Sequence, residues 1–151
     1  MKNIDHAERA KELFLGGYNC SQAVLLAFDD VTNLDEKTAA ALASSFGGGM
    51  GRMREVCGAV SGALMVLGLA KGYTSPKDNE MKKEHYALVQ EFAKRFKAEN
   101  GSIICRELLE GVKTTAGGAP EERTQTYYKK RPCPELVWEA ARITEELLEE
   151  K

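Results

Sequence analysis

The residues of this chain that are best suited to chemistry are its four cysteines, Cys20, Cys57, Cys105 and Cys133. No two of them form the C-x-x-C pair that is typical of zinc ribbons and thioredoxin-like sites, so their spacing alone assigns no function. A thiolate binds metals and attacks disulfides, whereas a protonated buried cysteine behaves as a small apolar side chain. The cysteines therefore allow three interpretations: a metal or cluster site, thiol–disulfide exchange, or packing in the core.

Each of these cysteines falls at, or in the first turn of, a predicted helix. A helix N-terminus presents unpaired N–H groups and the positive end of the helix dipole, and both favour a thiolate. The dipole alone lowers the pKa of a thiol by less than about one pH unit. Four neighbouring thiolates repel each other more strongly than that. If the four sulfurs converge, we expect them to be metallated, oxidised to disulfides or partly protonated.

A glycine run over residues 47–51, which includes Gly48 and Gly49, precedes Cys57. It predicts a turn whose backbone N–H groups lie near Cys57 and donate to a thiolate or a cluster sulfur. Together with Arg52 and Arg54, which follow it, the run could also cradle an anion ahead of a helix. It lacks the Gly-Lys-Ser/Thr of a P-loop and does not follow a predicted strand, which disfavours nucleotide binding.

Two further glycines, Gly58 and Gly62, narrow the helix that follows Cys57. Small residues on one helix face favour close packing against a neighbouring helix, and the same clearance could make room for a metal or cluster. The chain's two histidines, His6 and His85, both lie among charged residues, so we expect both to be solvated rather than to act as ligands.

The elements that position these residues are predicted to be helices, because alanine is abundant and strand-favouring valine and isoleucine are scarce. Apolar spacing, caps and glycine stops predict helices over 5–15, 20–28, 35–46, 55–71, 76–99 and 105–111, and a last one from 132 to about 148. The segment 112–130 is rich in threonine, glycine and charge, which predicts a long surface loop. Residues 1–151 are thus expected to form a single domain, a compact all-α bundle of about six or seven helices.

Composition limits the partners. The 151 residues include 21 Lys and Arg against 23 Asp and Glu, a balance that favours neither nucleic acid nor an anionic membrane surface. The most apolar stretch, residues 56–70, is shorter than the roughly 20 residues of a membrane-spanning helix. The first residues are charged where a signal peptide is apolar, so we expect a reducing cytoplasm, where cysteines seldom form structural disulfides.

The motif around Cys57 carries a resemblance to a known family. Residues 57–62 read CGAVSG, a C-G-A-x-x-G pattern with one cysteine upstream and two downstream, and residues 17–24 (GYNCSQAV) and 46–49 (FGGG) fit the same pattern. From Gly16 to about Ile143 the chain resembles the C_GCAxxG_C_C family of redox-active proteins. That family is similar to the cluster-bearing part of split-Soret cytochromes, which implies an iron–sulfur centre. The chain has no C-x-x-C-H, so attached haem is not implied.

We therefore expect Cys20, Cys57, Cys105 and Cys133 to gather into one site that holds an iron–sulfur cluster or zinc, with Gly48, Gly49, Gly58 and Gly62 shaping it. The expected function is electron transfer or redox sensing with an unidentified redox partner protein, rather than substrate turnover. Two alternatives stay open: thiol–disulfide exchange through a reversible cysteine pair, and a non-catalytic helical interaction module whose cysteines only pack. An amphipathic bundle also allows a homodimer.

Overall fold

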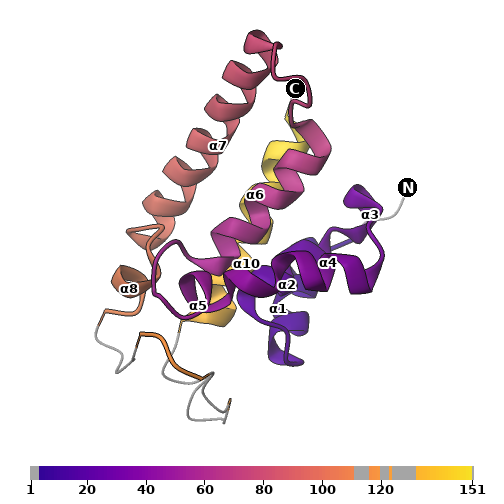
Figure 1. Cartoon of the computed structure of the whole chain (residues 1–151). Helices are drawn as coiled ribbons and strands as arrows, with labels where there is room; N and C mark the ends of the chain where they lie inside the picture. Colours follow the sequence, from indigo (N-terminus) through magenta and orange to yellow (C-terminus); the bar gives the residue numbers. More distant parts are fainter. Residues whose placement is uncertain (1–3, 111–115, 120–122, 124–131, 151) are drawn as a thin grey trace.

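The computed structural model describes residues 4–110, 116–119, 123 and 132–150, and these residues are built from helices (Figure 1). No β-strand occurs among them, which confirms the predicted all-α bundle. The helices are α1 (His6–Leu15), α2 (Cys20–Ala27), α3 (Asp29–Thr32), α4 (Glu36–Ala43), a 3-10 turn η1 (Ser44–Phe46), α5 (Gly47–Met50), α6 (Gly58–Lys71), α7 (Asn79–Asn100), α8 (Cys105–Leu108) and α10 (Cys133–Glu149).

Four helices form the centre of the molecule. The helix α2 packs against α1 and α6, and α10 packs against both α1 and α6. The long α7 lies against α10 and α6 on the outside of this group (Figure 1). The interior between these helices is filled by fully buried apolar side chains: Val24, Leu25, Phe28, Val60, Leu67, Phe92, Phe96, Val137 and Ile143.

The start of α2 is fixed by a reciprocal cap. The Asn19 side chain accepts the Gln22 N–H at 2.8 Å, and the Gln22 side chain accepts the Asn19 N–H at 3.1 Å. Such a capping box satisfies two N–H groups that a helix start leaves without partners. It makes Cys20 the first residue of α2. The Asn19 amide also donates to the Ser44 carbonyl at 3.2 Å, which ties this helix start to the turn before the glycine run.

Two predicted helix starts are wrong. The helix expected from Ser75 and Pro76 begins at Asn79, because the Asp78 carboxylate caps it by accepting the Met81 N–H at 3.0 Å. The helix expected from Glu55 begins at Gly58, because the preceding residues are extended and form an antiparallel bridge, Val56 with Ile104. This bridge sets the path of the chain into the site.

Other boundaries differ around the glycine run. The run does not simply stop the preceding helix, because residues 44–46 form η1 and residues 47–50 form the tight turn α5, with φ of 67° at Gly48 and 72° at Gly49. The short helix α3 was not expected, and α8 ends at Leu108 rather than at 111.

The structure describes part of the predicted loop over residues 112–130. Residues 116–119 and 123 are described, and the rest of the predicted loop lies outside the described residues. The Gly117 N–H donates to the Arg52 carbonyl at 2.7 Å, and the Arg123 guanidinium lies 4.5 Å from the centre of the Phe14 ring. These residues therefore contact the end of α1 and Arg52, which follows the glycine run.

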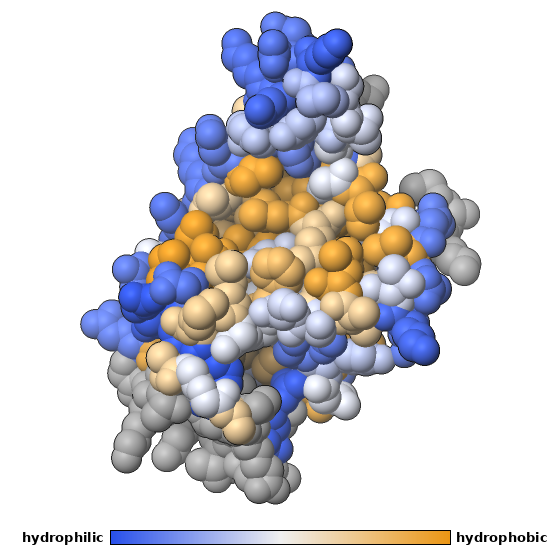
Figure 2. All heavy atoms as spheres, in the orientation of Figure 1, coloured by the Kyte–Doolittle hydropathy of each residue, from blue (hydrophilic) through white to orange (hydrophobic). Residues whose placement is uncertain are grey.

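The outer side of α6 is apolar. Figure 2 shows a band of apolar residues across the face seen in Figure 1, with hydrophilic residues above it and along its edges. Leu69 on α6 and Tyr86 on α7 remain 50% and 47% exposed. None of the helices in the described part of the chain combines the length and the apolar character that crossing a bilayer requires.

Candidate functional site

Each of the four cysteines stands at the start of a helix, as the sequence predicts. Cys20, Cys105 and Cys133 are the first residues of α2, α8 and α10, and Cys57 is the N-cap of α6. Cys57 and Cys105 are buried, whereas Cys20 and Cys133 are partly exposed, and all four are free thiols. Four helix starts that are remote in sequence thus carry one cysteine each.

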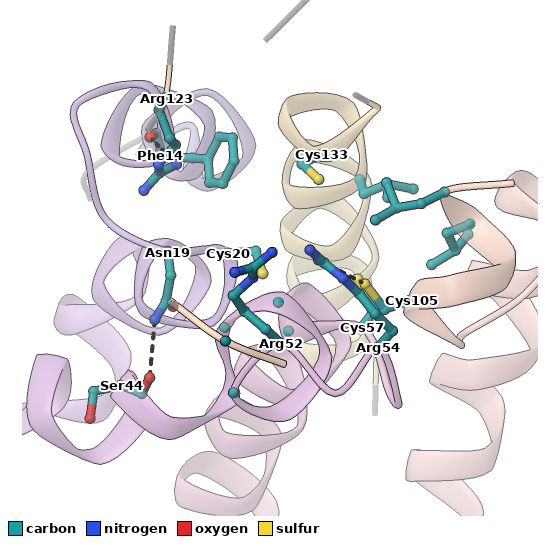
Figure 3. A pocket seen from close by; sticks show the side chains of 18 residues that line it. Phe14, Asn19, Cys20, Ser44, Arg52, Arg54, Cys57, Cys105, Arg123 and Cys133 are labelled. Atoms are coloured by element: carbon teal, nitrogen blue, oxygen red, sulfur yellow. Dashed lines mark hydrogen bonds between the residues drawn. The ribbon is translucent and has the colours of Figure 1, made fainter. Parts of the chain in front are cut away.

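The four cysteines line one cavity of about 290 Å³ (Figure 3). Phe14, Leu108, Leu109 and Leu136 add apolar walls. The other lining residues are glycines, three arginines, Asn19 and Ser44, and no carboxylate occurs among the described residues that line the cavity. The site is therefore a thiol-rich, cationic pocket.

The chain path brings Cys57 and Cys105 into the pocket together. On either side of the bridge between Val56 and Ile104, the Cys57 N–H donates to the Ile103 carbonyl at 2.8 Å, and the Cys105 N–H donates to the Glu55 carbonyl at 2.6 Å. This short two-stranded contact fixes the backbones of both cysteines where their helices begin. Two segments separated by the whole of α6 and α7 are thereby joined beside the pocket.

Glycines allow the cysteines to approach the chain closely. A Cβ on Gly58 would overlap the Cys20 sulfur, and a Cβ on Gly49 would lie 2.7 Å from the Cys105 Cβ. Gly62 instead meets the Ser21 carbonyl, at 2.6 Å from an added Cβ, so its clearance serves the packing of α6 on α2. Both glycines therefore lie where α6 approaches α2 closely, which fits the packing interpretation, and room for a metal or cluster stays a prediction.

The glycine run donates to a different cysteine from the one expected. The Gly48 N–H donates to the Cys20 sulfur, whereas the N–H groups that reach Cys57 come from Ala59 and Val60 in its own helix. The turn therefore donates to a thiol of the pocket, as predicted, but this thiol is Cys20 and not the neighbouring Cys57. The reason is the left-handed backbone at Gly48, which turns this part of the run toward the start of α2.

Burial controls the ionisation of two thiols. Desolvation in the pocket raises the pKa of Cys20 and raises the pKa of Cys57 well above its usual value, and the N–H donors oppose this effect only in part. Negative charge on Cys105 adds to the rise in the pKa of Cys20. Charge on Cys20 and on Cys133 does the same for Cys57. The sulfurs therefore influence each other electrostatically, and without a metal ion the pocket favours the protonated forms of Cys20 and Cys57.

Arginines form the second chemical component of the pocket. Arg52 and Arg54 extend from the glycine turn, and Arg123 reaches the pocket from the segment after α8 (Figure 3). Arg54 is only 6% exposed, and its Nη1 lies 3.9 Å from the Cys105 sulfur as a hydrogen-bond donor. Sequence analysis missed Arg123, because no local pattern ties it to a cysteine.

His6 is not solvated, contrary to the prediction. It is 8% exposed, its ring stacks on Phe28 with centres 4.2 Å apart, and its Nε2 lies 3.0 Å from an Asp30 carboxylate oxygen. The charged neighbours in sequence concealed a packed role at the start of α1. His6 does not line the cysteine pocket.

The sequence of the chain matches a known family. A family described as "Putative redox-active protein (C_GCAxxG_C_C)" matches residues 18–147, which is most of the chain. The chain belongs to the C_GCAxxG_C_C family. The matched range contains all four cysteines of this C_GCAxxG_C_C protein. No match to the chain was found among curated proteins or among solved structures.

The donor set of this C_GCAxxG_C_C protein can be tested against candidate metals. Around one tetrahedral zinc, Zn–S bonds of about 2.3 Å hold all the sulfurs within about 4.6 Å of each other. In the described part of the chain, no three His, Cys, Asp or Glu side chains are grouped closely enough to hold a single metal ion. A cluster binds its thiolates through several irons and is larger than one ion. The four thiols line one cavity without forming such a close group among the described residues.

Proposed function

We propose that Cys20, Cys57, Cys105 and Cys133 hold an iron–sulfur cluster, or a related multinuclear metal centre, for electron transfer or redox sensing. One observation carries the proposal: all four cysteines of the chain, from four separate helix starts, line the same cavity. Four thiolates are a usual ligand set for [2Fe–2S] and [4Fe–4S] centres. When bound, such a centre supplies one-electron chemistry.

The ionisation of the thiols supports a metal rather than thiol–disulfide exchange. Exchange needs a thiolate that is exposed at neutral pH. Burial instead raises the pKa of Cys20 and of Cys57, so both resist ionisation until a cation compensates their charge. Metal binding provides that compensation and releases the thiol protons. The same pocket that weakens these cysteines as nucleophiles thus suits them as ligands.

The chain's own groups would tune such a centre. The Gly48 N–H donates to the sulfur of Cys20, and Arg54 donates to the sulfur of Cys105. Hydrogen bonds to the ligand sulfurs and positive charge nearby both favour the more negative, reduced state, which raises the reduction potential. Leu108, Leu109 and Leu136 limit the access of water to the pocket.

We also propose that the protein works in a reducing compartment such as the cytoplasm, and that it exchanges electrons with another redox protein. The first part follows from the proposed ligand set, because a reducing compartment keeps cysteines as thiols. The second part follows from the proposed one-electron chemistry.

The test is purification of the full chain under argon, followed by assays of iron, acid-labile sulfide and zinc and by an absorption spectrum. We expect iron and sulfide in equal amounts, before or after anaerobic reconstitution, and visible absorption that decreases on reduction. Cys57→Ser and Cys133→Ser should each lower the iron content, whereas Gly68→Ala should not, because an added Cβ there meets nothing within 4 Å.

Two results would contradict the proposal. Zinc without iron or sulfide would exclude electron transfer at the site, because Zn²⁺ has no redox chemistry. Failure to retain any metal after reconstitution, together with reversible loss of two thiols, two protons and two electrons on oxidation, would assign thiol–disulfide exchange instead.

A further inference from the structure

The arginines of the pocket form a group of their own. Arg52 and Arg54 follow the glycine run and extend into the cavity that the cysteines line (Figure 3). Arg123, from the segment after α8, also lines this cavity. Coordination by thiolates does not require three guanidinium groups. Their convergence places guanidinium donors beside the four thiols of the cavity.

The backbone conformation of two of these arginines is unusual. Arg52 has φ of 69° and Arg54 has φ of 61°, in the left-handed region that residues with a Cβ rarely adopt. Such strain persists where surrounding contacts hold it, and it gathers at ligand clamps and active sites. Here the Arg52 carbonyl accepts the Gly117 N–H at 2.7 Å, and the Arg54 carbonyl accepts both the N–H and the Nε of Arg106, at 3.2 and 3.1 Å.

The pocket has a deep side and an outer side. Cys57, Cys105 and Arg54 are buried, whereas Arg52 is partly exposed and Gly51 and Gly118 on the lining are exposed. Arg52 thus lines the more exposed part of the cavity, and Arg54 lies deeper, beside the Cys105 sulfur. The cavity of about 290 Å³ is near the lower limit of small-molecule pockets, which favours a ligand of few atoms.

Arg123 is fixed at the rim by contacts that hold its plane. Its guanidinium donates to the carbonyls of Phe14 at 3.2 Å and of Tyr18 at 2.6 Å, and it stacks over the Phe14 ring. Its charge is thus held at one position beside the cavity, where it adds to the positive potential that Arg52 and Arg54 create.

We propose that this pocket binds a small oxyanion, gripped by Arg52 and Arg54 next to the cysteine sulfurs. Guanidinium groups donate paired N–H bonds that match the oxygens of a carboxylate, a phosphate or a sulfur oxyanion. The idea that this anion is a reactant or effector of the redox centre rests on the proposed function. The binding of the anion does not, because the arginines keep their charge whether or not a metal is present.

The test uses the full chain, reduced and metal-free, titrated with inorganic phosphate and with acetate by calorimetry, against sodium chloride at the same ionic strength. We expect saturable binding of at least one of the two oxyanions and none of chloride beyond screening. Arg52→Gln should weaken this binding by about tenfold or more. Arg142→Gln is the matched control, because Arg142 pairs with Glu139 and Glu146 on α10 and does not line the pocket.

Because Arg54 is buried, Arg54→Gln is measured together with Arg54→Lys, which keeps the positive charge but loses the paired N–H donors of the guanidinium group. If the glutamine variant fails to fold, Arg52→Gln alone carries the test. The proposal is overturned if neither oxyanion binds the wild-type chain, or if Arg52→Gln binds as tightly as Arg142→Gln.

Iron loading of Arg52→Gln is measured in parallel. Retained loading with lost anion binding separates this site from the metal site, and anion binding without any metal loading would leave the site standing while the proposed function fails.

Discussion

The sulfur of Cys20 lies against Gly58, so close that a Cβ on that residue would overlap it. The first residue of α6 therefore touches the first residue of α2, and the contact exists only because one of the two has no side chain. Gly58 is the residue of the C-G-A-x-x-G motif that directly follows Cys57. The motif thus couples the placement of two cysteines: Cys57 occupies the helix start, and its neighbour leaves room for Cys20.

Gly58→Ala should displace the Cys20 sulfur from the pocket. The added methyl would also meet the Phe46 carbonyl at 2.8 Å, so the backbone has little room to yield. Overpacking of this kind costs about 1–3 kcal/mol, and we expect loss of that order in the free energy of unfolding, measured with urea, together with lower iron loading.

Gly68→Ala on the same helix is the control. Gly68 is exposed and an added Cβ meets nothing within 4 Å, so the alanine should stabilise the chain by about 0.5–1 kcal/mol without affecting metal binding. Equal metal loading of the two variants would show that the contact between Gly58 and Cys20 does not shape the site.

Gly49→Ala should destabilise the protein more than alanine at another left-handed glycine does. Gly49 has φ of 72°, and an added Cβ would lie 2.7 Å from the Cys105 Cβ and 2.8 Å from the Arg54 Cα. Strain and overlap together predict a loss of about 2–4 kcal/mol. Gly101 ends α7 with φ of 92° and open space around it, so Gly101→Ala should cost only about 1 kcal/mol. Similar unfolding free energies of the two variants would contradict the close approach at Gly49.

The stability of the metal-free, reduced protein should fall above about pH 8.5. Burial raises the pKa of Cys57 in the folded state, so below the pKa of the unfolded thiol, about 8.5, both states are protonated and the full stabilisation is present. As the pH rises further, the unfolded state loses its proton first, and stability declines by up to about 1.4 kcal/mol per pH unit until the folded thiol ionises.

Cys57→Ala removes this titration and should flatten the decline. Urea unfolding of both proteins at pH 7, 8, 9 and 10 measures the difference and cancels the effect of other groups that titrate at alkaline pH. Parallel curves for the two proteins would mean that Cys57 is not desolvated in the pocket.

His6→Ala should lower the free energy of unfolding by about 2–4 kcal/mol, because it removes a buried ring from Phe28 and a hydrogen-bond partner from Asp30. His6→Phe keeps the stacked ring and should lose only about 1 kcal/mol. Urea unfolding at pH 7 compares them. If the two variants lose the same amount, the stacking on Phe28 contributes nothing.

The helices could be predicted where local signals agree. Asp5 accepts the Glu8 N–H, and Asn19 forms its capping box, so the starts of α1 and α2 follow from neighbouring residues. The start of α6 could not be predicted in this way. The residues before Gly58 directly precede a helix, so the sequence predicts that they belong to it. Their backbone is instead held extended by the bridge between Val56 and Ile104, which lies far along the chain.

The cysteines and glycines of the site were visible in the sequence, and the conformations of the arginines were not. A left-handed backbone is expected at Gly48 but not at Met50, Arg52 or Arg54. The Arg52 carbonyl is held by a hydrogen bond from Gly117, and the Arg54 carbonyl by hydrogen bonds from Arg106. Arg123 left no local signal, because its partners are backbone carbonyls at the end of α1. What could not be predicted is therefore the part of the pocket that depends on contacts between distant segments.

The assembly of the pocket from four distant helix starts has a consequence for the life of the chain in the cell. Cys20 leaves the ribosome early and Cys133 late, so the proposed ligand set is incomplete until α10 has emerged and docked against α1 and α6. If the four cysteines bind a metal centre as proposed, we expect it to be loaded after this docking, since long-range contacts of this kind form late and together. During synthesis the early thiols are exposed, and folding of the bundle then buries Cys57 and leaves Cys20 only partly exposed to oxidants.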